Sequence, residues 1–308
     1  MEEGLVIKTT GSWYYVKSES SELIPCKIRG TFRIKGIRAT NPVAVGDTVE
    51  FRRISDQDGG VIEKIAARKN YIIRKSSNLS HEYQLIASNI DQAMLMVSLM
   101  KPRTFLEFID RFLVSAEAFR IPVIILFNKI DVYQKKELSE LEDILDTYSN
   151  IGYQCLPISL KTGQGIDNVK ELIHSKVTVI AGNSGVGKST LLNTLDPTLQ
   201  LKTNEVSESN KSGRHTTTYA EMHMLENNTR VIDTPGIKGY GMVDIEKDEL
   251  FHFFPEIFEV SKDCKFNNCL HLNEPDCAVR NAVENEGISV SRYQSYINLL
   301  GDFNSKYR

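Results

Sequence analysis

The sequence predicts an α/β protein, in which a doubly wound sheet is preceded by a small β-barrel and followed by a short helical module. Short β-rich runs separated by turn residues fill residues 5–65, and apolar strands alternate with amphipathic helices over residues 91–193. Three cysteines and a histidine gather between residues 264 and 277. We therefore expect three domains, at residues 1–68, 69–240 and 241–308.

Length and composition fit an ordinary soluble protein. A chain of 308 residues can bury several cores, and a formal net charge of −3 gives no overall polybasic character that would favour nucleic acid. No apolar run approaches the roughly 20 residues of a membrane span. Residues Met1–Gly4 lack the basic and apolar regions of a signal peptide. We therefore expect a cytoplasmic protein with no membrane partner.

The first 65 residues predict a small barrel. Five β-rich runs are separated by turn residues: Leu5–Ile7, Trp13–Val16, Leu23–Ile28, Val49–Phe51 and Gly60–Ile65. An OB-fold is the leading interpretation, and an SH3-like barrel is the alternative.

A basic segment interrupts these runs and carries an aromatic residue, Phe32. It contains Lys27, Arg29, Arg33, Lys35 and Arg38, with no acidic side chain between them. Such a segment on an OB-like barrel can contact RNA, and an ordinary solvated loop is the equal alternative.

The central region alternates strands and helices after a polar stretch, residues 68–84, that we interpret as a linker. Apolar strands are predicted at residues 91–97, 122–127 and 153–158, with helices at 105–119, 138–148 and 166–174. Strands this apolar are typical of a parallel sheet covered on both faces. Ligands of such sheets bind at the carboxyl ends of the strands, so polar motifs that follow the strands are candidate sites.

One such motif runs from Gly182 to Ser189, after the β-branched run Val177–Ile180 and before a helix-like segment. It matches G-x-x-x-x-G-K-[ST], whose backbone amides and helix N-terminus bind nucleotide phosphates; an ordinary glycine turn is the alternative. Lys188 would reach the β- and γ-phosphates, and Ser189 would bind Mg²⁺. The predicted phosphate site comprises Gly182, Asn183, Ser184, Gly185, Val186, Gly187, Lys188, Ser189 and Thr190.

An N-K-x-D motif follows the second apolar strand and indicates guanine rather than adenine. The Asp131 carboxylate can accept hydrogen bonds from both N1–H and the 2-amino group of guanine, a pair that adenine does not offer. Asn128 can bond the purine edge, and the Lys129 stem can lie along the base. Ser159, after the third strand, resembles the segment that contacts the guanine carbonyl in GTPases.

These guanine motifs precede the phosphate motif, whereas ordinary GTPases have the reverse order. Because domain termini often lie close together, the same sheet can form after the old ends are joined and another loop is opened. The sequence therefore predicts a circularly permuted P-loop GTPase domain.

Two segments after the phosphate motif are expected to sense the γ-phosphate. The threonine-rich segment Gly213–Thr218 lies where switch I must fall, and we expect Thr217 to contact Mg²⁺. A predicted hairpin, residues 219–225 and 229–232, leads to the D-x-x-G motif, in which Asp233 would hold Mg²⁺ through water and the Gly236 N–H would bond the γ-phosphate.

The position after this motif bears on hydrolysis. Ile237 stands where small GTPases place the glutamine that orients water. His215 is therefore a third candidate catalytic residue, in addition to Lys188 and Gly236. The alternative is that His215 is an ordinary solvated histidine of a loop.

The last region predicts a helical module that holds one structural zinc. The pattern C-x4-C-x-H-x5-C supplies a complete tetrahedral set, Cys264, Cys269, His271 and Cys277, with no position left for catalysis. Buried free cysteines are the alternative. Helices are expected at residues 250–258, 279–284 and 293–300. Residues 241–308 carry twelve acidic and seven basic side chains, which disfavours RNA binding by simple electrostatic attraction to the phosphates.

Together, the OB-like barrel, the permuted order of the GTPase motifs and the terminal zinc pattern resemble the RsgA (YjeQ) family over essentially the whole chain. Leu160 departs from the usual S-A-K form of the segment after the third strand. The resemblance implies a monomeric Mg²⁺-dependent GTPase that binds GTP or GDP. It also implies a role in late maturation of the small (30S) ribosomal subunit, with binding to its 16S rRNA and stimulation by the subunit.

Two alternatives to this role differ in their biochemical class. One is a GTPase that regulates another RNA or translation client. The other is a zinc-containing RNA-binding module that uses GTP only as a ligand.

Overall fold

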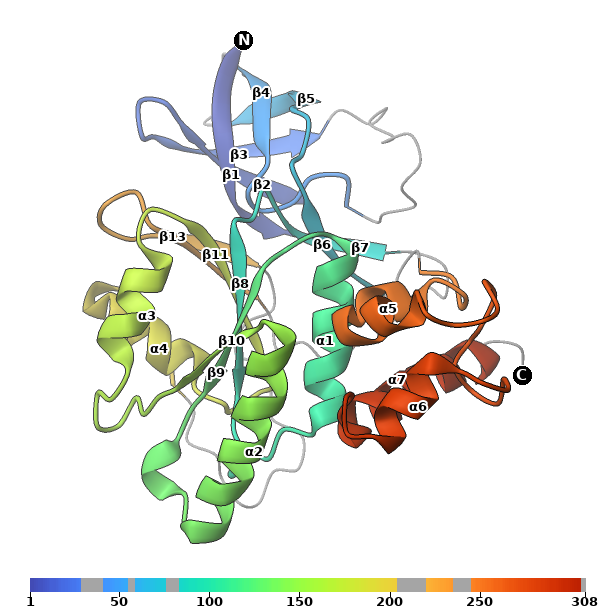
Figure 1. Cartoon of the computed structure of the whole chain (residues 1–308). Helices are drawn as coiled ribbons and strands as arrows, with labels where there is room; N and C mark the ends of the chain where they lie inside the picture. The colour runs from blue at the N-terminus through green and yellow to red at the C-terminus, as the bar shows by residue number, and fades with distance from the viewer. Residues whose placement is uncertain (29–40, 55–58, 76–82, 204–219, 235–244, 306–308) are drawn as a thin grey trace.

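The computed structural model describes residues 1–28, 41–54, 59–75, 83–203, 220–234 and 245–305. Along the chain it shows a β-barrel (blue in Figure 1), a mixed sheet with helices on both faces (cyan to light orange), and a helical module (orange to red). Among these residues, no helix combines the length and apolar character that a membrane span requires.

The barrel consists of five strands: β1 (Glu2–Thr10), β2 (Trp13–Ser18), β3 (Leu23–Ile28), β4 (Thr48–Arg53) and β5 (Gly60–Ile65). They pair in the order β1-β2-β3-β5-β4, and β4 pairs back to β1, so the barrel is closed. The β3–β5 pairing is parallel and the others are antiparallel. This closed order confirms the predicted OB-like barrel. Its core is filled from alternate positions of the strands, including Val6, Val16, Ile24, Phe51 and Ile62.

The prediction of a linker over residues 68–84 is wrong. Strands β6 (Tyr71–Lys75) and β7 (Tyr83–Ser88) form an antiparallel hairpin there. Its short apolar runs bury Ile72 and Leu85, and the polar residues on either side conceal these runs in the sequence. A parallel bridge between Val45 and Ala87 ties the hairpin to the segment before β4.

The central sheet has the order β10-β9-β8-β11-β13-β12. Its strands are β8 (Gln92–Val97), β9 (Val123–Phe127), β10 (Gln154–Pro157), β11 (Val177–Gly182), β12 (Glu221–Met224) and β13 (Arg230–Asp233). All pairings are parallel except that of the β12–β13 hairpin. Strands β9 and β10, which precede the guanine motifs, thus come before β11 in the chain and lie on the β8 side of it in the sheet. This arrangement agrees with the permuted order of the motifs.

The predicted hairpin over residues 219–232 is confirmed within the described residues. Asn227 and Asn228 at its turn have φ of 55° and 56°, the left-handed conformations that a tight hairpin turn needs. The hairpin also joins the sheet to the barrel, since β12 pairs with β1 at Lys8 and Glu221.

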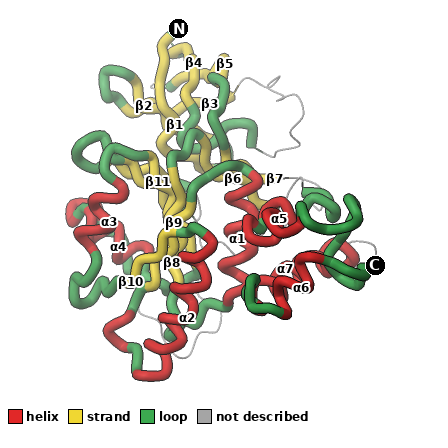
Figure 2. Tube along the Cα trace, in the orientation of Figure 1, coloured by secondary structure: helices red, strands yellow, loops and turns green. Residues whose placement is uncertain are grey.

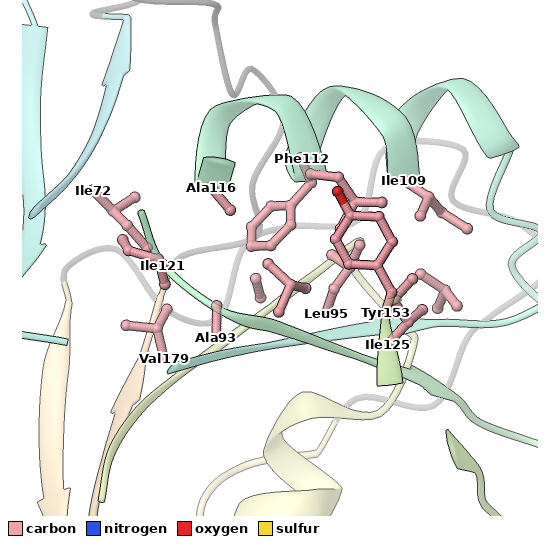
Figure 3. Packing of buried hydrophobic residues seen from close by; sticks show 14 of the residues in the cluster. Ile72, Ala93, Leu95, Ile109, Phe112, Ala116, Ile121, Ile125, Tyr153 and Val179 are labelled. Carbon is pink, nitrogen blue, oxygen red and sulfur yellow. The ribbon is translucent and has the colours of Figure 1, made fainter. Parts of the chain in front are cut away.

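Helices cover both faces of the sheet. One face packs against α1 (Leu106–Ala118) and α2 (Lys135–Ile151), and the other against α3 (Ile166–Ile173) and α4 (Lys188–Leu195). Figure 3 shows the first face, where Phe112 and Ala116 of α1 lie over Ala93 and Leu95 of β8. Because both faces are covered, every residue of β8 and β9 is buried.

The C-terminal module contains η3 (Leu250–Phe253), α5 (Pro255–Ser261), α6 (Ala278–Glu284) and α7 (Val290–Ser305). The helix predicted over residues 250–258 is interrupted, because Pro255 opens a new helix at its first position. The last helix begins before the predicted residue 293. The module packs beside α1 (Figures 1 and 2), and Val114 of α1 belongs to the same buried cluster as Phe254 and Tyr296.

Candidate nucleotide and metal sites

The predicted phosphate loop joins the end of β11 to the start of α4. Gly182 and Gly187 have φ of 145° and 113°, which residues with a side chain rarely adopt. A Cβ on Gly182 would lie 2.3 Å from the Met96 carbonyl oxygen, and one on Gly187 would lie 2.6 Å from Asn128 Nδ2. These glycines therefore let the loop lie directly against β8 and the guanine motif.

Lys188 places its ammonium inside the curve of this loop. Its Nζ donates to the carbonyls of Gly182 (2.8 Å) and Asn183 (2.9 Å). Burial lowers the pKa of Lys188, and the nearby carboxylate of Asp233 acts in the opposite direction. Asp233 is buried at the end of β13, and Ser189 lies half-buried in the first turn of α4. Three side chains predicted to serve the phosphates and Mg²⁺ thus come from adjacent elements.

The guanine motif is attached to the phosphate loop by its own side chains. Asn128, which is 2% exposed, donates from Nδ2 to the Val186 carbonyl (2.7 Å) and accepts at Oδ1 from the Leu160 N–H (3.3 Å). Lys129 has a left-handed backbone and donates from Nζ to the Gly185 carbonyl (2.9 Å). Three segments that are distant in the sequence therefore meet at one edge of the sheet.

Asp131 lies exposed at this edge, within the single turn η1 (Ile130–Val132). The Ser159 hydroxyl donates to Asp131 Oδ1 (2.7 Å) and accepts from the Thr162 N–H (3.1 Å). The serine thus orients a carboxylate that remains open to solvent, as an acceptor for a purine base must be.

Several predicted residues lie outside the described part of the chain. These are His215, Thr217, Gly236 and Ile237, together with the basic segment from Arg29 to Arg38. Lys27 is described, and its Nζ lies 4.4 Å from the centroid of the Trp13 ring on the barrel surface. That cation–π contact places one basic and one aromatic side chain together on the described part of the barrel.

The four predicted zinc ligands converge. Cys264 Sγ and Cys277 Sγ lie 3.6 and 3.5 Å from His271 Nδ1. The Cys264–Cys277 and Cys269–Cys277 sulfur separations are 3.9 and 3.7 Å. Zinc–sulfur and zinc–nitrogen bonds of about 2.3 and 2.0 Å in a regular tetrahedron require separations of roughly 3.8 Å between sulfurs and 3.5 Å between sulfur and nitrogen. The cluster therefore fits one structural zinc, with Nδ1 as the histidine donor.

Glu274 supports the loop that carries the last three ligands, and it was not predicted. Its carboxylate accepts the N–H groups of Leu270 (2.9 Å), Leu272 (2.8 Å) and Asn273 (3.0 Å). Burial opposes ionisation here, but these donors hold the pKa of Glu274 below its usual value. The ligand spacing alone contains no signal for this residue.

A buried ionic cluster joins the C-terminal module to α1, and it too was not predicted. Arg292 of α7 contacts Asp110 of α1 (2.7 Å), and both side chains are 1% exposed. The same guanidinium contacts the Glu256 carboxylate of α5 (2.7 Å), while the Tyr148 hydroxyl donates to Asp110 (2.6 Å). The module is therefore fastened to the helix that precedes the strand of the guanine motif.

Comparison with known proteins agrees with this architecture. A family model described as the RsgA GTPase matches residues 65–243, and one described as the RsgA N-terminal domain matches residues 3–62. The small ribosomal subunit biogenesis GTPase RsgA of Bacteroides fragilis (strain YCH46) is 53% identical, with 99% of each chain covered. The protein of the same name from Christiangramia forsetii is 50% identical, with 99% of this chain and 98% of that one covered.

Solved structures show the same likeness in three dimensions. The crystal structure of YjeQ from Thermotoga maritima superposes with a TM-score of 0.76 at 35% identity and 98% coverage of both chains. YloQ, described as a circularly permuted GTPase, superposes with a TM-score of 0.73 at 34% identity, covering 99% of this chain and 96% of that one. With family models matching both the barrel and the central sheet, this chain belongs to the RsgA family of circularly permuted GTPases.

Proposed function

We propose that this GTPase acts as a nucleotide-dependent switch in late maturation of the small (30S) ribosomal subunit. The observation that carries the nucleotide part is the bond from Asn128 Nδ2 to the Val186 carbonyl, because it unites the guanine motif and the phosphate loop in one site. The subunit enters from the relatives, which are named small ribosomal subunit biogenesis GTPases.

The roles of the site residues follow from their positions. Asp131, oriented by Ser159, would accept the two guanine N–H groups, and Lys129 would lie along the base. Lys188 would exchange its two carbonyl acceptors for phosphate oxygens, which gain more from an ammonium than neutral carbonyls do. Ser189 and Asp233 would hold Mg²⁺, which neutralises charge on the phosphates when it is bound.

For the partner, we propose that the barrel faces 16S rRNA and that the protein works as a cytoplasmic monomer. Trp13 and Lys27 support the first part, because aromatic side chains stack on unpaired bases and lysines bind phosphate. The acidic C-terminal module would then dock by shape rather than by charge.

Steady-state GTP turnover with and without purified small subunits tests this function. We expect strong stimulation by the subunits, and we expect Lys188→Ala to abolish turnover under both conditions. Turnover that ignores the subunits would favour a GTPase with another client. Specific GTP binding without turnover would favour a binding module that uses GTP as a ligand.

We also propose that His215 assists hydrolysis, because Ile237 cannot orient a water molecule. His215→Ala should lose subunit-stimulated turnover while its Kd for GTP stays unchanged. Unaltered turnover in this variant would remove His215 from the mechanism.

A further inference from the structure

Tyr133 is a buried side chain directly after the turn that carries Asp131. It is 8% exposed and packs in the core shared by α1, α2 and the sheet. Its hydroxyl lies at the meeting point of two loops, the guanine motif and the segment between β8 and α1. A buried polar atom in such a place is stable only when its hydrogen bonds are made.

The hydrogen atoms at this point can be assigned completely. Tyr133 donates its single hydroxyl hydrogen to the Asn128 carbonyl (2.9 Å) and accepts from the Leu99 N–H (2.7 Å). Ser98 Oγ, 3.2 Å from the same hydroxyl, uses its own hydrogen on the Met100 carbonyl (2.6 Å). Burial raises the pKa of Tyr133, so the hydroxyl retains the proton that it donates.

The segment held by Tyr133 in turn holds Lys129. Residues 98–104 form a closed turn, in which the Thr104 N–H donates to the Ser98 carbonyl (2.7 Å). Within this turn the Lys101 carbonyl accepts from Lys129 Nζ, whose other acceptor is the Gly185 carbonyl of the phosphate loop. The turn therefore supplies one of the two anchors that aim Lys129 across the proposed base site.

We propose that Tyr133 is a positioning residue for guanine binding, an inference that depends on the proposed guanine site. Its hydroxyl fixes the backbone of Asn128 and, through residues 98–104, the position of the Lys129 ammonium. It does so from the core, without touching the nucleotide. The affinity for the base therefore depends on the hydrogen bonds that the buried Tyr133 hydroxyl makes to the Asn128 carbonyl and the Leu99 N–H.

Tyr133→Phe isolates this role, because the ring remains in the core and only the hydroxyl is lost. The Asn128 carbonyl would lose this donor and the Leu99 N–H this acceptor, and both lie in a buried setting. Without these bonds the free protein should hold the motif in its binding geometry only about a tenth of the time, which raises the apparent Kd for GDP and GTP about tenfold. Binding of tripolyphosphate with Mg²⁺ should weaken far less than binding of GTP, and kcat at saturating GTP should fall much less than KM rises.

Tyr153→Phe is the matched control. Tyr153 is also 8% exposed in the same core, and its hydroxyl donates to Glu117 Oε1 (3.0 Å), far along α1 from the guanine motif. This variant should show a similar loss of thermal stability with wild-type Kd for GDP. Ser98→Ala removes the hydroxyl that bonds to Met100 within the same turn. This variant should therefore also raise the Kd for GDP, as Tyr133→Phe does.

Titrations with fluorescent GDP and ADP analogues separate the outcomes. Wild-type protein that binds ADP as tightly as GDP would overturn the guanine site and with it this inference. If the wild type prefers GDP, an unchanged Kd in Tyr133→Phe would refute the positioning role alone. An equal rise in Tyr133→Phe and Tyr153→Phe would also refute it, because general destabilisation would then explain both.

Discussion

Replacing Arg292 with methionine should loosen the C-terminal module from α1, and the loss of stability should grow with pH. Methionine is long and apolar enough to remain packed near Phe254, whose ring centroid lies 4.6 Å from the guanidinium carbon of Arg292. The change leaves Asp110 without its cation at a position that is 1% exposed. Removing one partner of a buried ion pair costs about 3–5 kcal/mol, and we expect the free energy of unfolding to fall by that amount near pH 8.

The direction of the pH effect follows from Asp110. Burial raises its pKa, and Arg292 opposes that effect, so the pKa should rise further in the variant. A carboxyl group that binds its proton more tightly in the folded state loses stability as the pH rises from its unfolded pKa, about 3.9, through its folded pKa. Arg292→Met should therefore cost less at pH 6 than at pH 8, and adding Asp110→Asn should recover part of the loss at pH 8.

Urea unfolding followed by circular dichroism at both pH values, with zinc present, measures these differences. Arg111→Met is the control, because Arg111 of α1 also contacts α7, through Asp302 (2.7 Å), but the two side chains are 26% and 45% exposed. Such a surface pair is worth about 1 kcal/mol or less. Equal losses in the two arginine variants, or a loss in Arg292→Met that neither pH nor Asp110→Asn alters, would refute the reasoning.

Two further predictions concern the glycine loop and the metal. Gly187→Ala should raise the Kd for GDP more than about tenfold, because the new Cβ would lie 2.6 Å from Asn128 Nδ2. Gly152→Ala is the control: Gly152 also has a positive φ, but no described atom lies within 4 Å of a Cβ there, so this variant should leave the Kd unchanged. Purified protein should contain one zinc per chain by atomic absorption, and Cys269→Ser should lose it while Cys155→Ser, outside the cluster, should retain it. A wild-type Kd in Gly187→Ala, or full zinc content in Cys269→Ser, would contradict these expectations.

The elements that the sequence predicted well are those with strong local patterns. The five barrel strands and the apolar strands β8 and β9 follow from short-range periodicity and turn residues. The contact of Asn128 with the phosphate loop and that of Ser159 with Asp131 follow from motif position, because these residues come after parallel strands of one sheet. The zinc cluster follows from ligand spacing.

What the sequence could not predict depends on contacts between distant residues. Arg292 and Asp110 are 182 positions apart, and nothing local distinguishes either from an ordinary surface charge. Tyr133 lies beside the guanine motif in the sequence, but its positioning role depends on the hydrogen bond from the Leu99 N–H, which only the folded chain brings close. The β6–β7 hairpin was missed because polar flanks outweighed two short apolar runs whose burial requires the rest of the domain.

The measurement that tests the central claim most directly is the base preference of Asp131→Asn. Xanthine has a carbonyl where guanine has its 2-amino group, so an amide at position 131 can donate to xanthine but loses the paired acceptors that guanine requires. Ser159 can still donate to the amide oxygen, so the loop should keep its geometry. Wild-type protein should bind GDP at least about tenfold more tightly than XDP, and the variant should reverse that order. A variant that keeps wild-type affinity for GDP would show that Asp131 does not read the base.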